Sequence, residues 1–155
     1  MTRKTGSEVD IDNLEAWAML QGYDPAIEYR QQIPLPPGYI SPHFREAEFR
    51  CNHCGELPAS GIDPALLDVL EDVRTHFEDK PVIINSGYRC VIHNANVGGA
   101  KNSQHLYGKA ADISVKNVPH ADVYAYLDPN HTGGLGKYKN FTHIDTRGSR
   151  ARWSG

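Results

Sequence analysis

The chain has 155 residues, of which 16 are Lys or Arg and 19 are Asp or Glu, so its formal net charge at pH 7 is -3. This length supports one domain of common size with a short additional segment. The acidic balance argues against nucleic acid as a partner, and no apolar run approaches the ~20 residues that a membrane-inserted helix requires.

The first 40 residues are predicted to be a lead segment and a linker. Residues 13–21 carry a weak helical pattern of apolar side chains that ends at Gly22. The run IPLPPG at residues 33–38 breaks regular structure and favours an extended linker. We therefore expect residues 1–40 to precede one domain formed by residues 41–155.

The strongest predicted helix begins at Asp63, a capping residue that is followed by Pro64. Its apolar stripe consists of Leu66, Leu67, Leu70, Val73 and Phe77. A buried strand is predicted over residues 81–86, which places Arg89 just beyond its end.

The second half of the chain predicts further strands and one more helix. A strand is expected over residues 110–115, and a shorter helix over 119–127 that starts at Asn117 or Val118. The glycine-rich run at 133–136 is predicted to turn into the last strands, one of them over 141–146. Helices packed on a small, largely antiparallel sheet give an α+β fold class.

Two short pairs of potential metal ligands also stand out. They are Cys51 with Cys54, and Cys90 with His93. Together they could form a Cys3His structural zinc site, although such pairs also arise without metal. The default interpretation is a set of free, partly buried thiols, because three cysteines cannot complete a disulfide framework.

Two histidines and an aspartate form a candidate catalytic metal site. As one straight strand, the stretch from His105 to Asp112 would span about 23 Å, too far for one ion. The chain is therefore predicted to turn at residues 107–109 and to continue as a strand that carries Asp112. His143 would reach the same cleft from the strand at 141–146. Each residue alone has an ordinary structural explanation, and only their joint placement indicates a hydrolytic zinc site with three protein ligands.

Several motifs carry a resemblance to a known family. They are SGYR at residues 86–89, SQHLYGKAAD at 103–112 and FTHID at 141–145, extended by SPHF at 41–44, HNANVGGAKNS at 93–103 and Arg-Trp at 152–153. This region resembles the zinc D-alanyl-D-alanine carboxypeptidases and related murein endopeptidases, whose fold is shared with the hedgehog signalling domain, and in particular their phage-lysin branch. The resemblance implies that His105, Asp112 and His143 hold Zn²⁺, that Arg89 stabilises the oxyanion and that Ser103 contacts substrate.

The general base departs from the family pattern. Family members often place an acidic residue or histidine just before the last zinc ligand, whereas this chain has Asn, Phe and Thr at residues 140–142. Asp145 is the preferred candidate, because it shares a strand face with His143. The alternative is a carboxylate that orients His143 or pairs with Arg147. Tyr138 and His131 are more distant candidates.

The resemblance implies a zinc-dependent peptidase that hydrolyses a peptide bond at a D-amino acid in the peptidoglycan of the bacterial cell wall, in the manner of an endolysin. The alternative is a non-catalytic, zinc-containing module that binds peptidoglycan. Residues 1–12 are polar and contain no apolar signal region. We therefore expect accumulation in the host cytoplasm before release to the wall, with secretion by another route as the alternative. The scissile bond, exopeptidase or endopeptidase action and the oligomeric state stay open.

Overall fold

The computed structural model describes residues 35–155, so the helix predicted over residues 13–21 lies outside the described residues. The chain divides into two units after residue 46, and of the first unit the structure describes residues 35–46. In the first unit, β1 (Tyr39–Ser41) and β2 (Phe44–Arg45) form an antiparallel pair. The predicted domain boundary after residue 40 stays a prediction.

The second unit contains the remaining helices and strands. A 3-10 helix, η2 (Glu46–Phe49), spans the boundary between the two units. It is followed in chain order by α3 (Pro64–His76), β3 (Val82–Ser86), α4 (Val91–Asn96), η3 (Gln104–Tyr107), β4 (Ala110–Val115), α5 (His120–Leu127), β5 (Gly134–Lys137), β6 (Thr142–Asp145) and β7 (Ala151–Ser154). Among the described residues, no helix is long and apolar enough to cross a bilayer.

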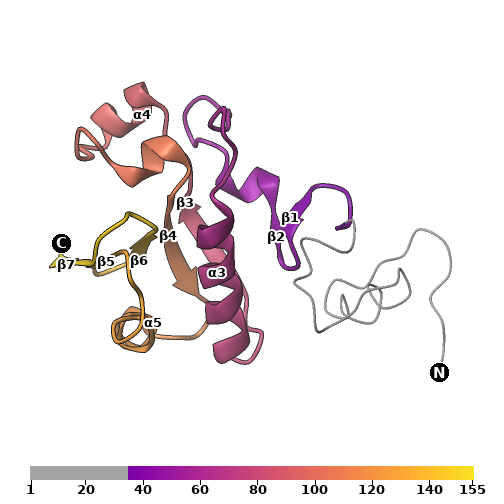
Figure 1. The fold of residues 1–155 in the computed structure, drawn as a ribbon, viewed down its shortest axis with the longest axis vertical. Coiled ribbons are helices and arrows are strands. Elements are labelled where there is room, and N and C mark those ends of the chain that lie inside the picture. Colours follow the sequence, from indigo (N-terminus) through magenta and orange to yellow (C-terminus); the bar gives the residue numbers. More distant parts are fainter. Residues whose placement is uncertain (1–34) are drawn as a thin grey trace, which may run out of the picture. The chain divides into compact units, whose positions relative to one another are not determined.

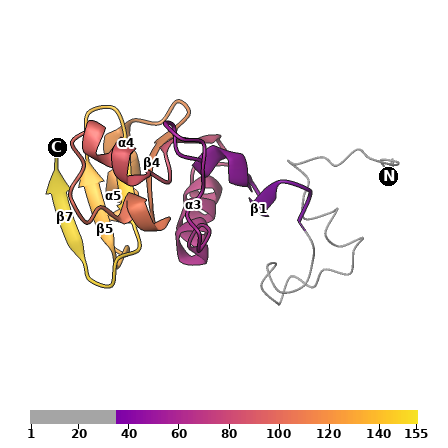
Figure 2. The same cartoon turned by 90° about the horizontal axis from the view of Figure 1, so that it is seen from above.

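Five strands form one mixed sheet in the order β3-β4-β6-β5-β7. The β3-β4, β4-β6 and β6-β5 pairs are antiparallel, and only β7 runs parallel to its neighbour β5. Helix α3 lies along β3 and β4, and α5 packs against β5 (Figure 1). Strand β7 forms the outer edge of the sheet (Figure 2). This arrangement confirms the predicted α+β class.

The alternation of side chains along the strands separates the core from a polar face. On β4 and β6, Ile113 and Ile144 are fully buried. Because successive strand residues point to opposite faces, the neighbouring Asp112 and His143 lie on the other side of the sheet. The core is completed by apolar side chains from the helices and from β5, namely Leu66, Leu67, Leu70, Val73, Val123, Leu127 and Leu135.

Most predicted elements occur at the predicted positions, but the glycine-rich run does not form a turn. The helix cap at Asp63 is confirmed, since its side chain accepts a hydrogen bond from the backbone N–H of Ala65. The second helix is capped by Pro119 rather than by Asn117 or Val118. Gly134 lies in strand β5, where an added Cβ would collide with the carboxylate of Asp145. Glycine is therefore needed here for close packing and not for a chain reversal.

Candidate metal centre

His105 is positioned by a short 3-10 helix. This helix, η3, begins after Ser103, whose hydroxyl oxygen accepts a hydrogen bond of 3.3 Å from the backbone N–H of His105. It ends at Gly108, which adopts a left-handed φ of 70° that glycine tolerates without strain. The chain therefore reverses between His105 and Asp112, as the spacing predicted.

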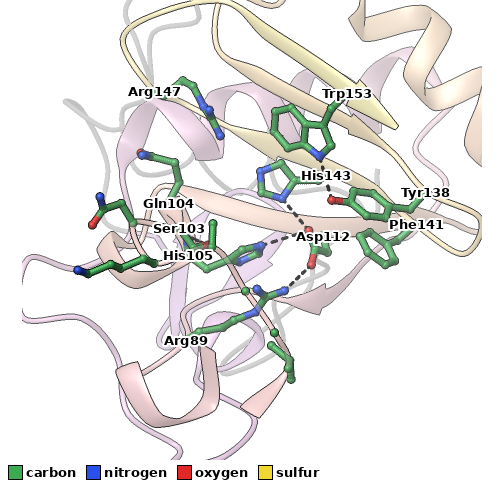
Figure 3. A pocket seen from close by; sticks show the side chains of 16 residues that line it. Arg89, Ser103, Gln104, His105, Asp112, Tyr138, Phe141, His143, Arg147 and Trp153 are labelled. Carbon is green, nitrogen blue, oxygen red and sulfur yellow. Dashed lines mark hydrogen bonds and ion pairs between the residues drawn. The ribbon is translucent and has the colours of Figure 1, made fainter. Parts of the chain in front are cut away.

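The other two candidate ligands, Asp112 and His143, lie on the adjacent strands β4 and β6. Asp112 of β4 lies directly opposite His143 of β6 in the sheet register. The Nδ1 atom of His143 lies 2.9 Å from Asp112 Oδ1, and the Nε2 atom of His105 lies 3.2 Å from the same oxygen. All three side chains are buried and point toward one another (Figure 3). One potential ligand atom from each residue falls within 4.8 Å of the others, so the three predicted ligands are brought together.

Each imidazole has a hydrogen-bond acceptor on the side that faces away from the candidate metal position. His105 Nδ1 is 2.7 Å from the carbonyl oxygen of Gly87, and His143 Nε2 is 2.7 Å from Asp145 Oδ2. A neutral imidazole that donates to such an acceptor keeps its lone pair on the other nitrogen. His105 Nε2, His143 Nδ1 and Asp112 Oδ1 converge on one point, and with the ring protons on the far nitrogens both lone pairs would face a cation held there. Two imidazole nitrogens and one carboxylate oxygen are a donor set of catalytic zinc, and these residues fit that metal.

Contacts between the candidate ligands shift the pKa values of Asp112 and His143. Burial opposes ionisation of Asp112, but the contacts with His105 and His143 outweigh it and hold the pKa of this carboxyl far below its usual range. Burial also disfavours the charged form of His143, yet its contacts with Asp112 and Asp145 raise the imidazole pKa above its ordinary value. Asp112 is therefore an anion at neutral pH, and His143 attracts either a proton or a metal cation.

Asp145 lies on the far side of the His143 ring from Asp112. Its carboxylate is fully buried and is held by Arg147 through two contacts of 2.8 Å, from Nε to Oδ1 and from Nη2 to Oδ2. The backbone N–H of Gly134 donates to Oδ1 at 3.0 Å. Although burial opposes ionisation, the hydrogen bonds from His143 and Arg147 keep the pKa of Asp145 well below its usual range. Both oxygens of this carboxylate are thus occupied by donors.

Arg89 reaches the site from beyond the end of β3. Its Nη2 atom donates to Asp112 Oδ2 at 2.9 Å, Nε donates to the hydroxyl oxygen of Ser86 at 3.2 Å, and Nη1 donates to Asn94 Oδ1 at 3.4 Å. The guanidinium lines the cleft, and 15% of the Arg89 side chain remains exposed. The predicted oxyanion-stabilising residue therefore lies beside the candidate ligands with a fixed orientation.

A cleft of about 780 Å³, with both polar and apolar lining, opens over these groups. One wall is the segment 97–104, which contains Ser103, and the other includes Tyr138, Phe141 and Trp153. The indole N–H of Trp153 donates to the Tyr138 hydroxyl at 2.8 Å (Figure 3). The cleft is therefore large enough for a short peptide segment and is lined by groups that can recognise one.

Asn94 has a role in the site that no sequence pattern indicates. This buried side chain receives the Arg89 hydrogen bond and donates to the carbonyl oxygen of Ala100 at 2.8 Å, so it links the guanidinium to the cleft wall. No local signal identified it beyond its place inside the HNANVGGAKNS motif. His131, a distant candidate for the base, instead contacts the backbone carbonyl of Asp145 through Nε2 at 2.7 Å.

Residues 42–145 match the family model described as Peptidase M15. The chain belongs to the peptidase M15 family. This result confirms the resemblance that the sequence motifs indicated, and the match covers all three candidate metal ligands.

Individual relatives match over parts of their length. A zinc D-Ala-D-Ala carboxypeptidase of Streptomyces albus G is 52% identical over 44 residues, which are 28% of this chain and 17% of that protein. The probable peptidoglycan L,D-endopeptidase MepK of Haemophilus influenzae is 33% identical over 103 residues, covering 61% of this chain and 55% of the relative. MepK of Escherichia coli K12 is 34% identical over 97 residues, with coverages of 57% and 53%. The matched region thus spans about half of each MepK relative.

Proposed function

We propose that this M15 family protein is a zinc-dependent peptidase that hydrolyses a peptide bond at a D-amino acid in bacterial peptidoglycan. The observation that carries the proposal is the convergence of His105 Nε2 and His143 Nδ1 on the Asp112 carboxylate. The names of the carboxypeptidase and MepK relatives support the substrate class. An endolysin-like release from a host cytoplasm stays a prediction.

Different residues of the site would bind the metal, stabilise negative charge and contact the substrate. His105, Asp112 and His143 would hold the zinc ion, which when bound would lower the pKa of a water molecule to about 7 and polarise a carbonyl group. The Arg89 guanidinium faces the same cleft and is held by three hydrogen bonds, so it can stabilise negative charge that develops on the scissile carbonyl oxygen. Ser103 lines the cleft beside His105, where a substrate peptide would lie.

For Asp145, the geometry supports the orienting role over that of proton acceptor. Its Oδ2 atom lies 2.7 Å from His143 Nε2, and this contact keeps His143 Nδ1 directed at Asp112. Both carboxylate oxygens are also bound to Arg147. We therefore assign Asp145 as a positioning residue for His143.

The variant Asp145→Asn tests this assignment. Loss of the orienting charge is expected to weaken zinc binding by about 10- to 100-fold while turnover at saturating zinc largely persists. Zinc titration with a competing chelator measures the affinity, and cell-wall hydrolysis at saturating zinc measures the turnover. Asp128→Asn is the matched control, because Asp128 is a half-exposed carboxylate that pairs with Arg150 and Arg152.

The positioning role and the proton-acceptor role of Asp145 predict opposite effects of Asp145→Asn on zinc affinity and on turnover. If this carboxylate accepts the proton from water, zinc affinity is retained and turnover at saturating zinc falls by about 100- to 10,000-fold. That outcome would replace the positioning role with a catalytic one.

A second candidate function is a non-catalytic module that binds peptidoglycan. One observation favours it: among the described residues that line the cleft, Asp112 is the only carboxylate, and Arg89 and two histidines already occupy it. A hydrolase needs a proton acceptor near the attacking water, whereas a binding module does not.

Purified cell walls distinguish these two functions. We expect the zinc-loaded protein to release new amino groups, to lose this activity after chelation and to regain it when zinc is restored. Mass spectrometry of the released muropeptides then identifies the scissile bond. Tight binding to the walls without release of amines, at any zinc concentration, would instead establish the binding module.

A further inference from the structure

Three cysteines that are distant in sequence meet in a second cluster of the 47–155 unit. The sulfur atoms of Cys51, Cys54 and Cys90 all lie within 4.8 Å of one another. None of the three forms a disulfide, and Cys51 is buried. The candidate catalytic ligands belong to a separate group, so this cluster is not accounted for by the proposed peptidase site.

The backbone is folded around these sulfur atoms. Cys51 Sγ accepts a hydrogen bond of 3.4 Å from the backbone N–H of Cys90, and Cys90 Sγ accepts one of 3.4 Å from the backbone N–H of His93. The loop after Cys51 is closed by a bond of 2.9 Å from Gly55 N to Cys51 O, with Gly55 at a φ of 73°. Backbone N–H groups directed at sulfur favour the thiolate, which is the form that binds metals.

The arrangement suits a tetrahedral ion better than a disulfide. Zinc–thiolate bonds of about 2.3 Å at tetrahedral angles place the sulfur atoms about 3.8 Å apart. Three mutually close sulfur atoms match this requirement, whereas a disulfide would join two of them and leave the third unused. The spacing also matches, since Cys-x2-Cys and Cys-x2-His pairs are common in structural zinc sites.

We propose that Cys51, Cys54 and Cys90 bind a structural zinc ion, with His93, whose ring nitrogens lie outside the 4.8 Å cluster of the three sulfur atoms, turning in as the fourth ligand. His93 lies one helical turn after Cys90 in α4 and is partly buried. Its ring stacks on that of His53, with centroids 6.1 Å apart. His53 is exposed and lies inside the Cys51–Cys54 loop, so it serves as the internal comparison for the fourth position.

This ion would fix the segment that carries Arg89. The Tyr88 backbone N–H donates to the carbonyl oxygen of Phe49 at 2.8 Å, and Gly87 packs directly against the Phe49 backbone. The Gly87 carbonyl oxygen in turn lies 2.7 Å from His105 Nδ1. A metal ion that joins Cys90 to Cys51 and Cys54 would therefore restrict the movement of residues 87–90. This consequence rests on the proposed function, but the metal site itself does not.

Metal content provides the first test. The purified holoprotein is expected to contain two zinc ions per chain, the double variant Cys51→Ser/Cys54→Ser one, and the double variant His105→Ala/His143→Ala also one. Because the two variants remove different ions, failure of the cysteine site and failure of the proposed catalytic site are distinguished. A single zinc in the wild-type protein that disappears in the histidine variant would overturn the cysteine site.

Cobalt substitution tests the wild-type protein directly, so the result does not depend on folding of a variant. Cobalt(II) bound by thiolates gives intense sulfur-to-metal charge-transfer absorption, which a site of two histidines and one aspartate lacks. We expect this absorption in the fully loaded protein, and we expect the bound metal to protect all three thiols from alkylation. Absent charge transfer, with three thiols that react freely in the metal-loaded protein, would contradict the proposal.

The fourth ligand is tested by His93→Ala against His53→Ala. We expect the His93 variant to weaken metal binding at the thiolate site by at least about tenfold, measured by chelator competition, and the His53 variant to bind as the wild type does. The reverse pattern would exclude His93 as the fourth ligand.

Discussion

Replacing His105 with alanine is expected to lower the rate of cell-wall hydrolysis by at least about a thousandfold. The metal contributes several kcal/mol of transition-state stabilisation, and each ~1.4 kcal/mol corresponds to a factor of ten in rate. His105 offers one of three converging ligand atoms, and its removal also leaves the buried carbonyl oxygen of Gly87 without its partner. The ion would then be held by Asp112 and His143 alone.

The His105→Ala experiment combines zinc content with amine release from purified walls. The variant is expected to lose one zinc ion per chain and its activity together, and excess zinc should restore little of either. His76→Ala is the matched control, because His76 is an exposed residue of α3 that stacks on Tyr126. A His105 variant that lost its zinc and still turned over at the wild-type rate would remove this metal from the mechanism.

The elements predicted most accurately are those encoded by short local patterns. Helix α3 follows from Asp63 and Pro64 at its start and from the apolar spacing along its length, and its predicted core positions Leu66 and Leu70 are fully buried. Strand β4 occupies the predicted residues 110–115. In both cases the chemistry of the cap or the alternation of apolar residues is sufficient, because the deciding interactions are local.

The convergence of His105 with Asp112 was also accessible from the sequence, because the distance limit on a strand required a turn between them. The placement of His143 needed one further assumption, that its strand pairs with β4. The folded sheet shows this pairing, since Asp112 of β4 lies directly opposite His143 of β6. The sequence alone does not determine this register.

Long-range packing determined the features that the sequence did not reveal. The glycine-rich run forms β5 because the Asp145 carboxylate approaches Gly134, and parallel strand β7 places Trp153 beside Tyr138. Likewise, the sequence placed Asp145 and His143 on one strand face but could not say which imidazole nitrogen meets the carboxylate. The nitrogen that Asp145 contacts decides its role. A carboxylate at the cleft could accept a proton from water, whereas one behind the His143 ring orients that ring.

Replacing Arg89 with alanine is expected to reduce kcat by about 100- to 1,000-fold, the usual cost of removing one preorganised donor from an oxyanion site. The guanidinium is fixed by Ser86, Asn94 and Asp112, so little reorganisation is needed when charge develops on the substrate. Because that charge exists mainly in the transition state, the loss should appear in kcat more than in KM. Hydrolysis of a defined muropeptide at saturating zinc separates these two parameters.

A purely structural role for Arg89 makes a different prediction. If the guanidinium only neutralises Asp112, the alanine variant should bind zinc differently and unfold more easily, yet keep full turnover when saturated with metal. Arg89→Lys separates these roles further, since an ammonium restores the positive charge but not the planar fork that contacts three partners, and its kcat should fall between the wild type and the alanine variant. Arg150→Ala removes the same charge from an exposed pair with Asp128 and should leave turnover unchanged. Full activity of Arg89→Ala at saturating zinc would therefore assign Arg89 to the support of Asp112 alone.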